Sequence, residues 1–109
     1  MSDINHVFIS GRIGADPKIK YFDSGSVICE ISVGVNRWNK KKDAEDTTWL
    51  NCKIWGKRAE FVAEYVKSGD MAFISGSIQK DVYKDADGKQ CANTYIVVEE
   101  IKTQKKQQK

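Results

Sequence analysis

The chain has 109 residues, of which 40% are hydrophobic and 30% are charged, and its formal net charge at pH 7 is +3. This length fits one domain with a modest core, and no apolar run reaches the length of a membrane span or a signal peptide. Three widely separated cysteines, Cys29, Cys52 and Cys91, fall in strand-like stretches, so we expect reduced core thiols and a cytoplasmic protein.

The first half of the chain predicts strands. Residues 6–13 and 27–35 alternate apolar and polar side chains, which is the pattern of strands with one buried face. Residues 18–22 form a short extension between two turns. Residues 36–46 are polar and predict a long hairpin arm, and residues 47–55 alternate again as a further strand.

The second half predicts one helix and two strands. Residues 57–69 repeat apolar side chains at three- and four-residue spacing and end in glycine, which predicts a helix. Residues 70–80 return to alternation, an Asp-Gly turn follows at 87–88, and residues 92–101 form the last strand. Residues 102–109 are too polar to pack, so we expect a short basic flexible tail.

The order of these elements indicates a fold. Three strands, one helix and two further strands, with glycines at the bends, is the element order of an OB barrel. We therefore predict an all-β domain with one helix over residues 1–101, a five-stranded OB-fold barrel with long β-hairpin loops. Such barrels bind single-stranded nucleic acid on one outer face and in their loops.

The strand at 47–55 directs two tryptophans away from the predicted core. Alternation divides it into a core face and an outer face: Leu50, Cys52 and Ile54 against Trp49, Asn51, Lys53 and Trp55. Aromatic rings stack on bases of any identity, and neighbouring cations hold phosphates. An outer tryptophan is alternatively buried in a subunit interface or under a loop, an explanation that weakens when several aromatics share the pattern.

Aromatic and basic residues also recur together in the predicted hairpins. Trp38 precedes a run of lysines, and Tyr83 lies between Lys80 and Lys84. The lysine run is by default a solvated loop tip, but its position beside Trp38 favours phosphate contact. The candidate nucleic-acid-binding residues are Trp38, Trp49, Trp55, Tyr83, Arg37, Lys40, Lys41, Lys42, Asn51, Lys53, Lys57, Lys80 and Lys84.

The sequence argues against an enzyme. A cysteine nucleophile needs a nearby base, but the cysteines fall on core-facing positions and His6 is the single histidine. We interpret His6 as a strand or interface residue, and Phe61 and Tyr65 as packing residues of the helix. Suitably spaced metal ligands and a glycine-rich phosphate loop are missing, so we predict no catalytic residue, no metal and no cofactor.

Three segments resemble the bacterial-type single-stranded DNA-binding protein family. They are "NHVFISGRIGADPKIKY", "TTWLNCKIWGKRAEFVAEYVKSGD" and "VYKDADGKQCANTYIVV", in matching order from about residue 4 to residue 101. The resemblance implies an OB fold that assembles as a homotetramer, with a dimer as the alternative, and coats single-stranded DNA in replication, recombination and repair, associated with the nucleoid. It implies that the stacking aromatics are Trp38, Trp49, Trp55 and Tyr83.

Two departures from this family bear on function. Leu50 occupies a position that is usually polar, which weakens the case for a base contact there. The family usually continues into a long tail with an acidic, phenylalanine-terminated tip that recruits partner proteins, whereas this sequence ends in "KKQQK" and predicts no such tip. An alternative function is a primosome-type adaptor, a dimeric OB protein that mainly contacts replication proteins, but such an adaptor does not need four stacking aromatics.

Overall fold

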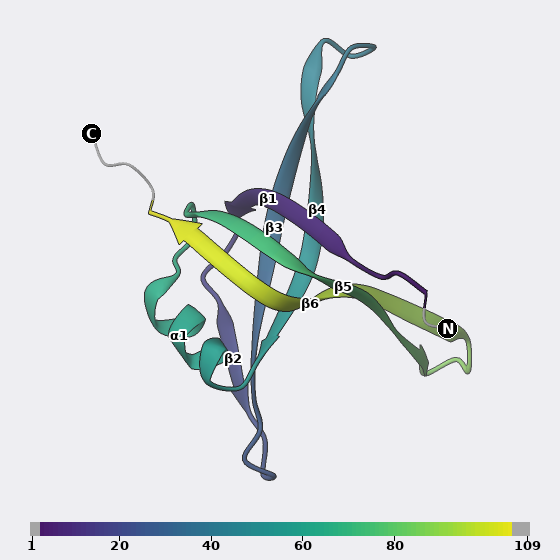
Figure 1. Ribbon diagram of the computed structural model, residues 1–109. Coiled ribbons are helices and arrows are strands. Elements are labelled where there is room, and N and C mark those ends of the chain that lie inside the picture. Colours follow the sequence, from purple (N-terminus) through teal and green to yellow (C-terminus); the bar gives the residue numbers. More distant parts are fainter. Residues whose placement is uncertain (1–2, 106–109) are drawn as a thin grey trace.

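The computed structural model describes residues 3–105, which form six strands and one helix (Figure 1). No helix within these residues is long and apolar enough to cross a membrane. The predicted class, all-β with one helix, is confirmed. The elements are β1 (Val7–Ile13), β2 (Lys18–Tyr21), β3 (Val27–Asn39), β4 (Ala44–Trp55), α1 (Lys57–Tyr65), β5 (Met71–Lys84) and β6 (Gln90–Gln104).

Five of the strands close into a barrel. β1 pairs antiparallel with β5, β5 with β6, and β3 with β4. A short parallel contact, which includes Cys52 opposite Ile96, joins β4 to β6, and Arg12 opposite Gly34 joins β1 to β3. β2 pairs with β3 and lies outside this ring. The predicted five-stranded barrel is therefore confirmed, with the short extension at 18–22 as a sixth, flanking strand.

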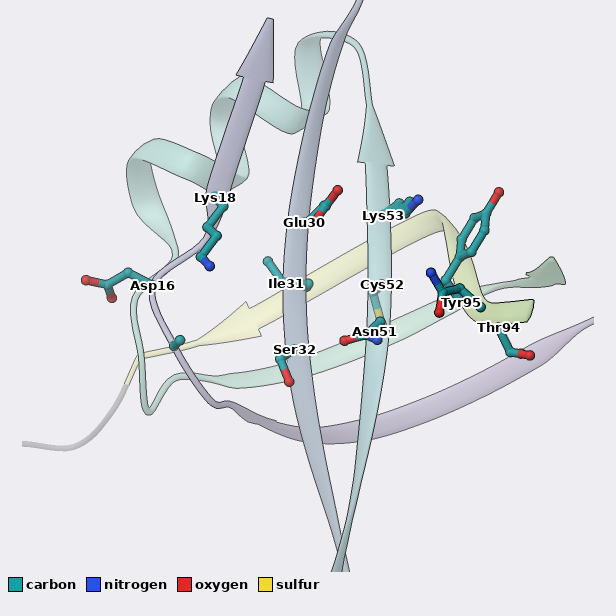
Figure 2. A pocket seen from close by; sticks show the side chains of 12 residues that line it. Asp16, Lys18, Glu30, Ile31, Ser32, Asn51, Cys52, Lys53, Thr94 and Tyr95 are labelled. Carbon is teal, nitrogen blue, oxygen red and sulfur yellow. The ribbon is translucent and has the colours of Figure 1, made fainter. Parts of the chain in front are cut away.

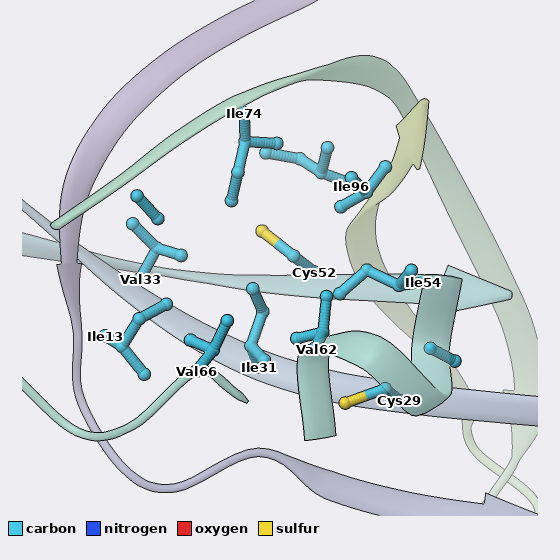
Figure 3. Close-up of a cluster of buried hydrophobic side chains, with 13 residues drawn as sticks. Ile13, Cys29, Ile31, Val33, Cys52, Ile54, Val62, Val66, Ile74 and Ile96 are labelled. Carbon is cyan, nitrogen blue, oxygen red and sulfur yellow. The ribbon is translucent and has the colours of Figure 1, made fainter. Parts of the chain in front are cut away.

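Alternation along the strands produces the core. Cys52 and Ile54 of β4 are completely buried, whereas Trp49, Asn51 and Trp55 on the opposite face of the same strand are exposed. In α1, Ala59 and Val62 are three residues apart and both face the barrel, because that spacing places them on one side of a helix. The buried cluster is shown in Figure 3 and comprises Ile13, Cys29, Ile31, Val33, Cys52, Ile54, Ala59, Val62, Val66, Ala72, Ile74, Ile96 and Val98.

Two hairpins extend beyond the barrel, as Figure 1 shows. The β3–β4 pairing continues to Asn39 opposite Ala44, and the β5–β6 pairing continues to Lys84 opposite Gln90. The side-chain amide of Asn39 donates to Asp46 at 2.6 Å and its oxygen accepts a backbone N–H from the turn. The predicted long polar arm at 36–46 is thus a paired ribbon with a closed tip.

The last strand is longer than expected. β6 continues to Gln104, past the predicted domain boundary at residue 101, because polar residues extend the antiparallel pairing with β5 while their side chains face solvent. Residues 102–104 of the predicted tail are therefore part of β6. Residues 106–109 of that tail lie outside the described residues.

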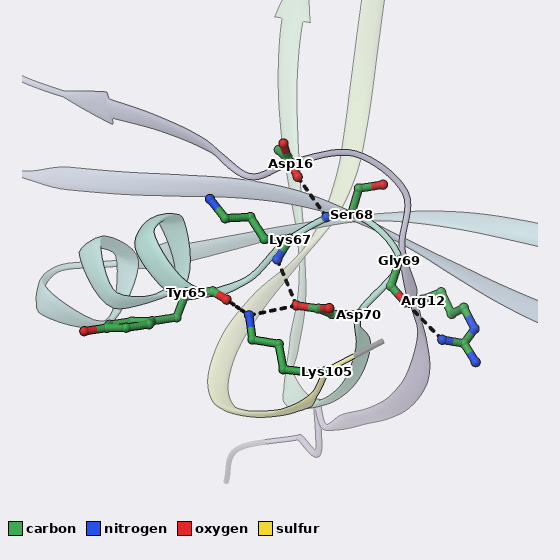
Figure 4. Close-up of polar contacts among 8 residues, drawn as sticks. All are labelled: Arg12, Asp16, Tyr65, Lys67, Ser68, Gly69, Asp70 and Lys105. Atoms are coloured by element: carbon green, nitrogen blue, oxygen red, sulfur yellow. Dashed lines mark hydrogen bonds and ion pairs between the residues drawn. The ribbon is translucent and has the colours of Figure 1, made fainter. Parts of the chain in front are cut away.

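Lys105 attaches the end of β6 to the segment that follows the helix (Figure 4). Its Nζ donates to the Tyr65 carbonyl and lies 3.2 Å from Asp70 Oδ2. Asp70 is only 3% exposed and also accepts the backbone N–H of Lys67 at 2.9 Å. A buried carboxylate is stable when charged and hydrogen-bonded partners surround it, so Lys105 is part of the folded domain.

Two aromatic residues of the helix contradict the sequence-based interpretation. Phe61 and Tyr65 were expected to pack, but they are 55% and 51% exposed. They are four residues apart and contact each other on the outer face of α1, with ring centroids 4.7 Å apart. The small residues Ala59 and Val62 occupy the buried face instead, because the helix lies close to the barrel.

The cysteines divide into two classes. Cys29 and Cys52 are buried, as predicted, and burial raises the pKa of Cys29 to about 11, with a smaller contribution from Glu30, and that of Cys52 to about 12. The expectation of a core position for Cys91 is wrong. It lies half-exposed at the start of β6, where the hairpin has left the barrel, with Sγ 3.7 Å from Asp85 Oδ2.

We expect one rapidly reacting thiol per native chain at pH 8. The raised pKa keeps Cys29 and Cys52 protonated at this pH, and burial blocks reagent access, whereas Cys91 is accessible. A chromogenic disulfide reagent should count one fast thiol in the native protein and three in denaturant. Cys91→Ser should abolish the fast phase; two fast thiols in the native parent would contradict the burial of the other pair.

Candidate nucleic-acid interface

Three tryptophans share the outer face of the β3–β4 ladder. Trp49 lies opposite Gly34, and Trp38 lies four positions beyond Gly34 on β3, so alternation places both tryptophans on the same face. Trp55 lies six positions beyond Trp49 on β4 and also belongs to that face. Trp38, Trp49 and Trp55 are 54%, 59% and 49% exposed, which confirms their predicted placement away from the core.

Glycines make room for the Trp49 ring. A Cβ at Gly14 would lie 2.5 Å from Cζ3 of Trp49, and a Cβ at Gly34 would lie 2.8 Å from the same atom. Gly14 is held in place by its backbone N–H, which donates to the Ser32 carbonyl at 2.8 Å. The ring therefore lies against backbone that no side chain covers, in a position defined by two glycines.

Gly14→Ala should displace the Trp49 ring and weaken binding of single-stranded DNA several-fold. The added methyl group would occupy space that the indole now fills, and the three atoms nearest to it would all belong to this ring. Titrations that follow intrinsic fluorescence would measure the affinity. In a Trp49→Ala background the same substitution should have no further effect; an equal loss in both backgrounds would show that Gly14 acts otherwise than through Trp49.

A pocket of about 380 Å³ is lined in part by Asn51, Cys52 and Lys53, the residues of β4 that lie between Trp49 and Trp55 in the sequence (Figure 2). Ser32 of β3 and Asn51 of β4 lie opposite each other in the ladder and contribute to its lining. Figure 2 shows Asp16 and Lys18 on one side and Thr94 and Tyr95 on the other. The remaining lining residues are Ala15, Glu30, Ile31, Cys52, Lys53 and Asn93.

Lys53 is engaged at the edge of this pocket by two groups. Its Nζ lies 3.7 Å from Asp81 Oδ2 and 4.2 Å from the centroid of the Tyr95 ring. The Tyr95 hydroxyl donates to Asp81 Oδ1 at 3.3 Å. Desolvation of the hydroxyl, together with the charge and hydrogen bond of Asp81, raises the pKa of Tyr95. Lys53 was a predicted site residue, but the acid beside it was not foreseen.

Tyr95 is a site residue that the sequence reasoning missed. It is half-buried, lines the pocket and lies under the Lys53 ammonium. Its sequence neighbours Ile96 and Val98 are buried, so alternation alone assigns Tyr95 to the outer face. The signal that identified the tryptophans of residues 47–55 was therefore present in β6 as well.

The hairpin tip gathers exposed positive charge near Trp38. Lys40 and Lys41 are exposed, and Lys42 Nζ lies 3.7 Å from Asp46 Oδ1. Arg37 is exposed too, but alternation places it on the face of β3 opposite to Trp38. The hairpin tip therefore presents a group of lysines. Arg37, although adjacent to Trp38 in the sequence, lies on the other face of the strand from the Trp38 ring.

The remaining predicted residues lie at two other places. Tyr83 is exposed on the second hairpin and shares a face of β5 with Asp81, whereas Lys80 and Lys84 lie on the opposite face. The structure therefore does not gather Tyr83 with these two lysines. Lys57 begins α1 and lines, with Trp55, a second pocket of about 300 Å³.

The site offers groups that suit binding of a planar, charged chain. Planar rings and amide groups follow the outer face of the ladder, and cations lie at its hairpin tip. Within residues 3–105, no three His, Cys, Asp or Glu side chains gather as a metal site requires. The arrangement suits a flexible chain of planar, hydrogen-bonding groups joined by negative charges.

Comparison with known proteins agrees with this geometry. The model of the single-strand binding protein family matches residues 4–104. A "Single-stranded DNA-binding protein 1" of Synechocystis sp. is 44% identical over 82 residues, which cover 75% of this chain and 67% of that protein.

Two further relatives match more of this chain. A "Single-stranded DNA-binding protein" of Thermosynechococcus vestitus is 40% identical over 99 residues, covering 90% of this chain and 80% of the relative. A "Single-stranded DNA-binding protein 2" of Listeria monocytogenes is 34% identical over 99 residues, covering 90% of this chain and 62% of the relative. With nearly the whole barrel matched, this chain belongs to the single-strand binding protein family.

Proposed function

We propose that this chain binds single-stranded DNA by stacking bases on the outer face of the β3–β4 ladder. The observation that carries the proposal is the exposure of Trp38, Trp49 and Trp55 on one continuous face. Each stacked base is worth about 1–3 kcal/mol, and stacking does not depend on which base is bound. Binding should therefore be tight and nearly independent of sequence.

The two hairpins extend this site beyond the barrel. Lys40, Lys41 and Lys42 at the first tip are placed to hold phosphates of a strand that also contacts Trp38. Tyr83 on the second hairpin offers a further ring. Arg37, Asn51, Lys53, Lys57, Lys80 and Lys84 remain candidates for contacts along the same strand, each to be tested by substitution.

The proposed role is protection of single-stranded DNA in replication, recombination and repair. The protein acts by binding and not as an enzyme, as is general for this family. A cytoplasmic, nucleoid-associated location follows from that role. The alternative of an adaptor that mainly contacts replication proteins lacks a specific observation in its favour, because an adaptor has no need of an exposed row of tryptophans.

Titration with homopolymer oligonucleotides would test the proposal. Bases stacked on the indole rings should quench intrinsic tryptophan fluorescence strongly, and dT and dA oligomers should bind with comparable affinity. Duplex DNA of the same length should compete poorly, because its bases are paired and stacked. Equal affinity for single strands and duplex would overturn the assignment of this face to base stacking.

Self-association through β1 is the second part of the proposal. One edge of β1 pairs with β5, but on the other edge only Arg12 and Ile13 pair with β3 among the described residues. Phe8 is 71% exposed on the same strand. An unpaired edge beside an exposed aromatic invites a second copy of the chain.

We expect a homotetramer, with a dimer as the alternative, at micromolar concentration. Sedimentation would distinguish the two states, and Phe8→Glu should shift the assembly toward smaller species while the barrel remains folded. A parent protein that sediments as a monomer would contradict this part of the proposal but would leave the stacking site untouched.

A further inference from the structure

The pocket lined by Ser32, Asn51 and Lys53 is unusual for a DNA site because acids accompany its cations. Lys53 lies 3.7 Å from Asp81, and Lys20, next to the pocket, lies 3.2 Å from Glu30. A phosphate needs a cation whose charge is available, because neutralisation of phosphates produces the electrostatic part of the affinity. Lys53 and Lys20 thus already have carboxylate partners, whereas Lys18, which also lines the pocket, makes no ion pair within residues 3–105.

Asp81 also fixes where Lys53 lies. Its second carboxylate oxygen accepts the Tyr95 hydroxyl at 3.3 Å, which holds the ring beneath the ammonium at 4.2 Å. Attraction between an ammonium and an aromatic face adds to the ion pair. One carboxylate from β5 thus arranges a lysine from β4 and a tyrosine from β6 at the edge of the pocket.

The interior of the pocket is polar and uncharged where Ser32, Asn51 and Asn93 line it. Within residues 3–105, these three side chains make no hydrogen bond with another residue. Amide and hydroxyl groups donate and accept, which matches the edges of unpaired bases. A volume of about 380 Å³ lies within the usual range of small-ligand pockets.

We propose that Asp81 determines what the pocket accepts: by holding Lys53 over Tyr95, it withholds this lysine from phosphates and leaves the stretch between Trp49 and Trp55 to a nucleobase. This inference rests on the proposed binding of single-stranded DNA to this face. Phosphates then follow the hairpin tip, and the base edge contacts Asn51 within the pocket.

A comparison of salt dependence tests the inference. The parent, Asp81→Asn, and the double variant Asp81→Asn with Lys53→Gln would be titrated with a dT oligomer over a range of salt. The parent and the double variant carry the same net charge at this position, so their slopes of log affinity against log salt should coincide. Asp81→Asn alone frees Lys53 for a phosphate and should steepen the slope by about 0.7.

Asp87→Asn is the matched control, because it removes the same charge from the nearby β5–β6 turn without freeing Lys53. Its slope should change by less than half as much as that of Asp81→Asn. Equal changes in the two variants would overturn the inference. A double variant flatter than the parent by about 0.7 would do so too, because Lys53 would then contact a phosphate in the parent.

Asn51→Ala tests the base contact separately. Loss of a hydrogen bond to a base should lower affinity about two- to tenfold at every salt concentration without changing the slope. Unchanged affinity would overturn the assignment of the pocket to a base. If the parent failed to bind single-stranded DNA, or bound it without quenching of its tryptophan fluorescence, the proposed function itself would be wrong. That outcome is distinguishable from every result of the Asp81 and Asn51 variants.

Discussion

Replacing Trp49 or Trp55 with alanine is expected to weaken single-stranded DNA binding by about 1–3 kcal/mol each, which is the usual value of one stacked base. Both rings are largely exposed on the outer face of β4, whereas Cys52 and Ile54 between them supply the core. The fold should therefore survive both substitutions. Fluorescence or anisotropy titration would give the affinities, and circular dichroism would check the fold.

Phe61→Ala provides the matched control for these variants. Phe61 is about as exposed as the two tryptophans, but it lies on the outer face of α1 and does not belong to the β3–β4 ladder. Its removal should leave the affinity unchanged. An equal loss from Phe61→Ala would place the DNA path across the helix, and unfolding of Trp49→Ala or Trp55→Ala would show that these rings support the barrel.

Replacing Lys40, Lys41 and Lys42 with glutamine should flatten the salt dependence of binding. Each phosphate neutralised contributes about −0.7 to the slope of log affinity against log salt, so three contacts amount to a change of up to ~2. The ion pair between Lys42 and Asp46 partly neutralises one of the three lysines, so we expect a change in the lower part of that range. Quenching at saturation should hardly change, because the stacking rings remain.

Removal of residues 106–109 is the comparison for the hairpin variant. These residues carry Lys106 and Lys109 and leave intact both β6 and the contact of Lys105 with Asp70. Charges outside a defined contact are screened beyond about 8–10 Å at ordinary salt, so the truncation should matter little near physiological salt. A larger loss from the truncation than from the hairpin substitutions would place the phosphate path elsewhere.

The barrel and the tryptophan face could be predicted because both depend on local periodicity. Alternation within residues 47–55 assigns Cys52 to the core and Trp49 to solvent whatever the rest of the chain does. The same rule, applied to β6, would have identified Tyr95. The helix was also predicted, although the exposure of Phe61 was not, because the distance between helix and barrel decides which residue fits between them.

Features that depend on distant parts of the chain were not predictable. The ion pair of Lys53 with Asp81 joins β4 to β5, strands that are not neighbours in the sheet. β6 extends to Gln104 because it pairs with β5, and the polar side chains of residues 102–104 do not show the alternation that predicts a strand. Cys91 lies half-exposed because its hairpin leaves the barrel, which alternation alone does not reveal.

Single-tryptophan variants give the most direct test of base stacking on the β3–β4 face. Three proteins would each retain one of Trp38, Trp49 and Trp55, with the other two replaced by phenylalanine so that an aromatic ring remains at every position. Saturation with a dT oligomer long enough to span the ladder should quench the fluorescence of each retained tryptophan. Quenching of none of them, in proteins that still bind the oligomer, would contradict base stacking on this face.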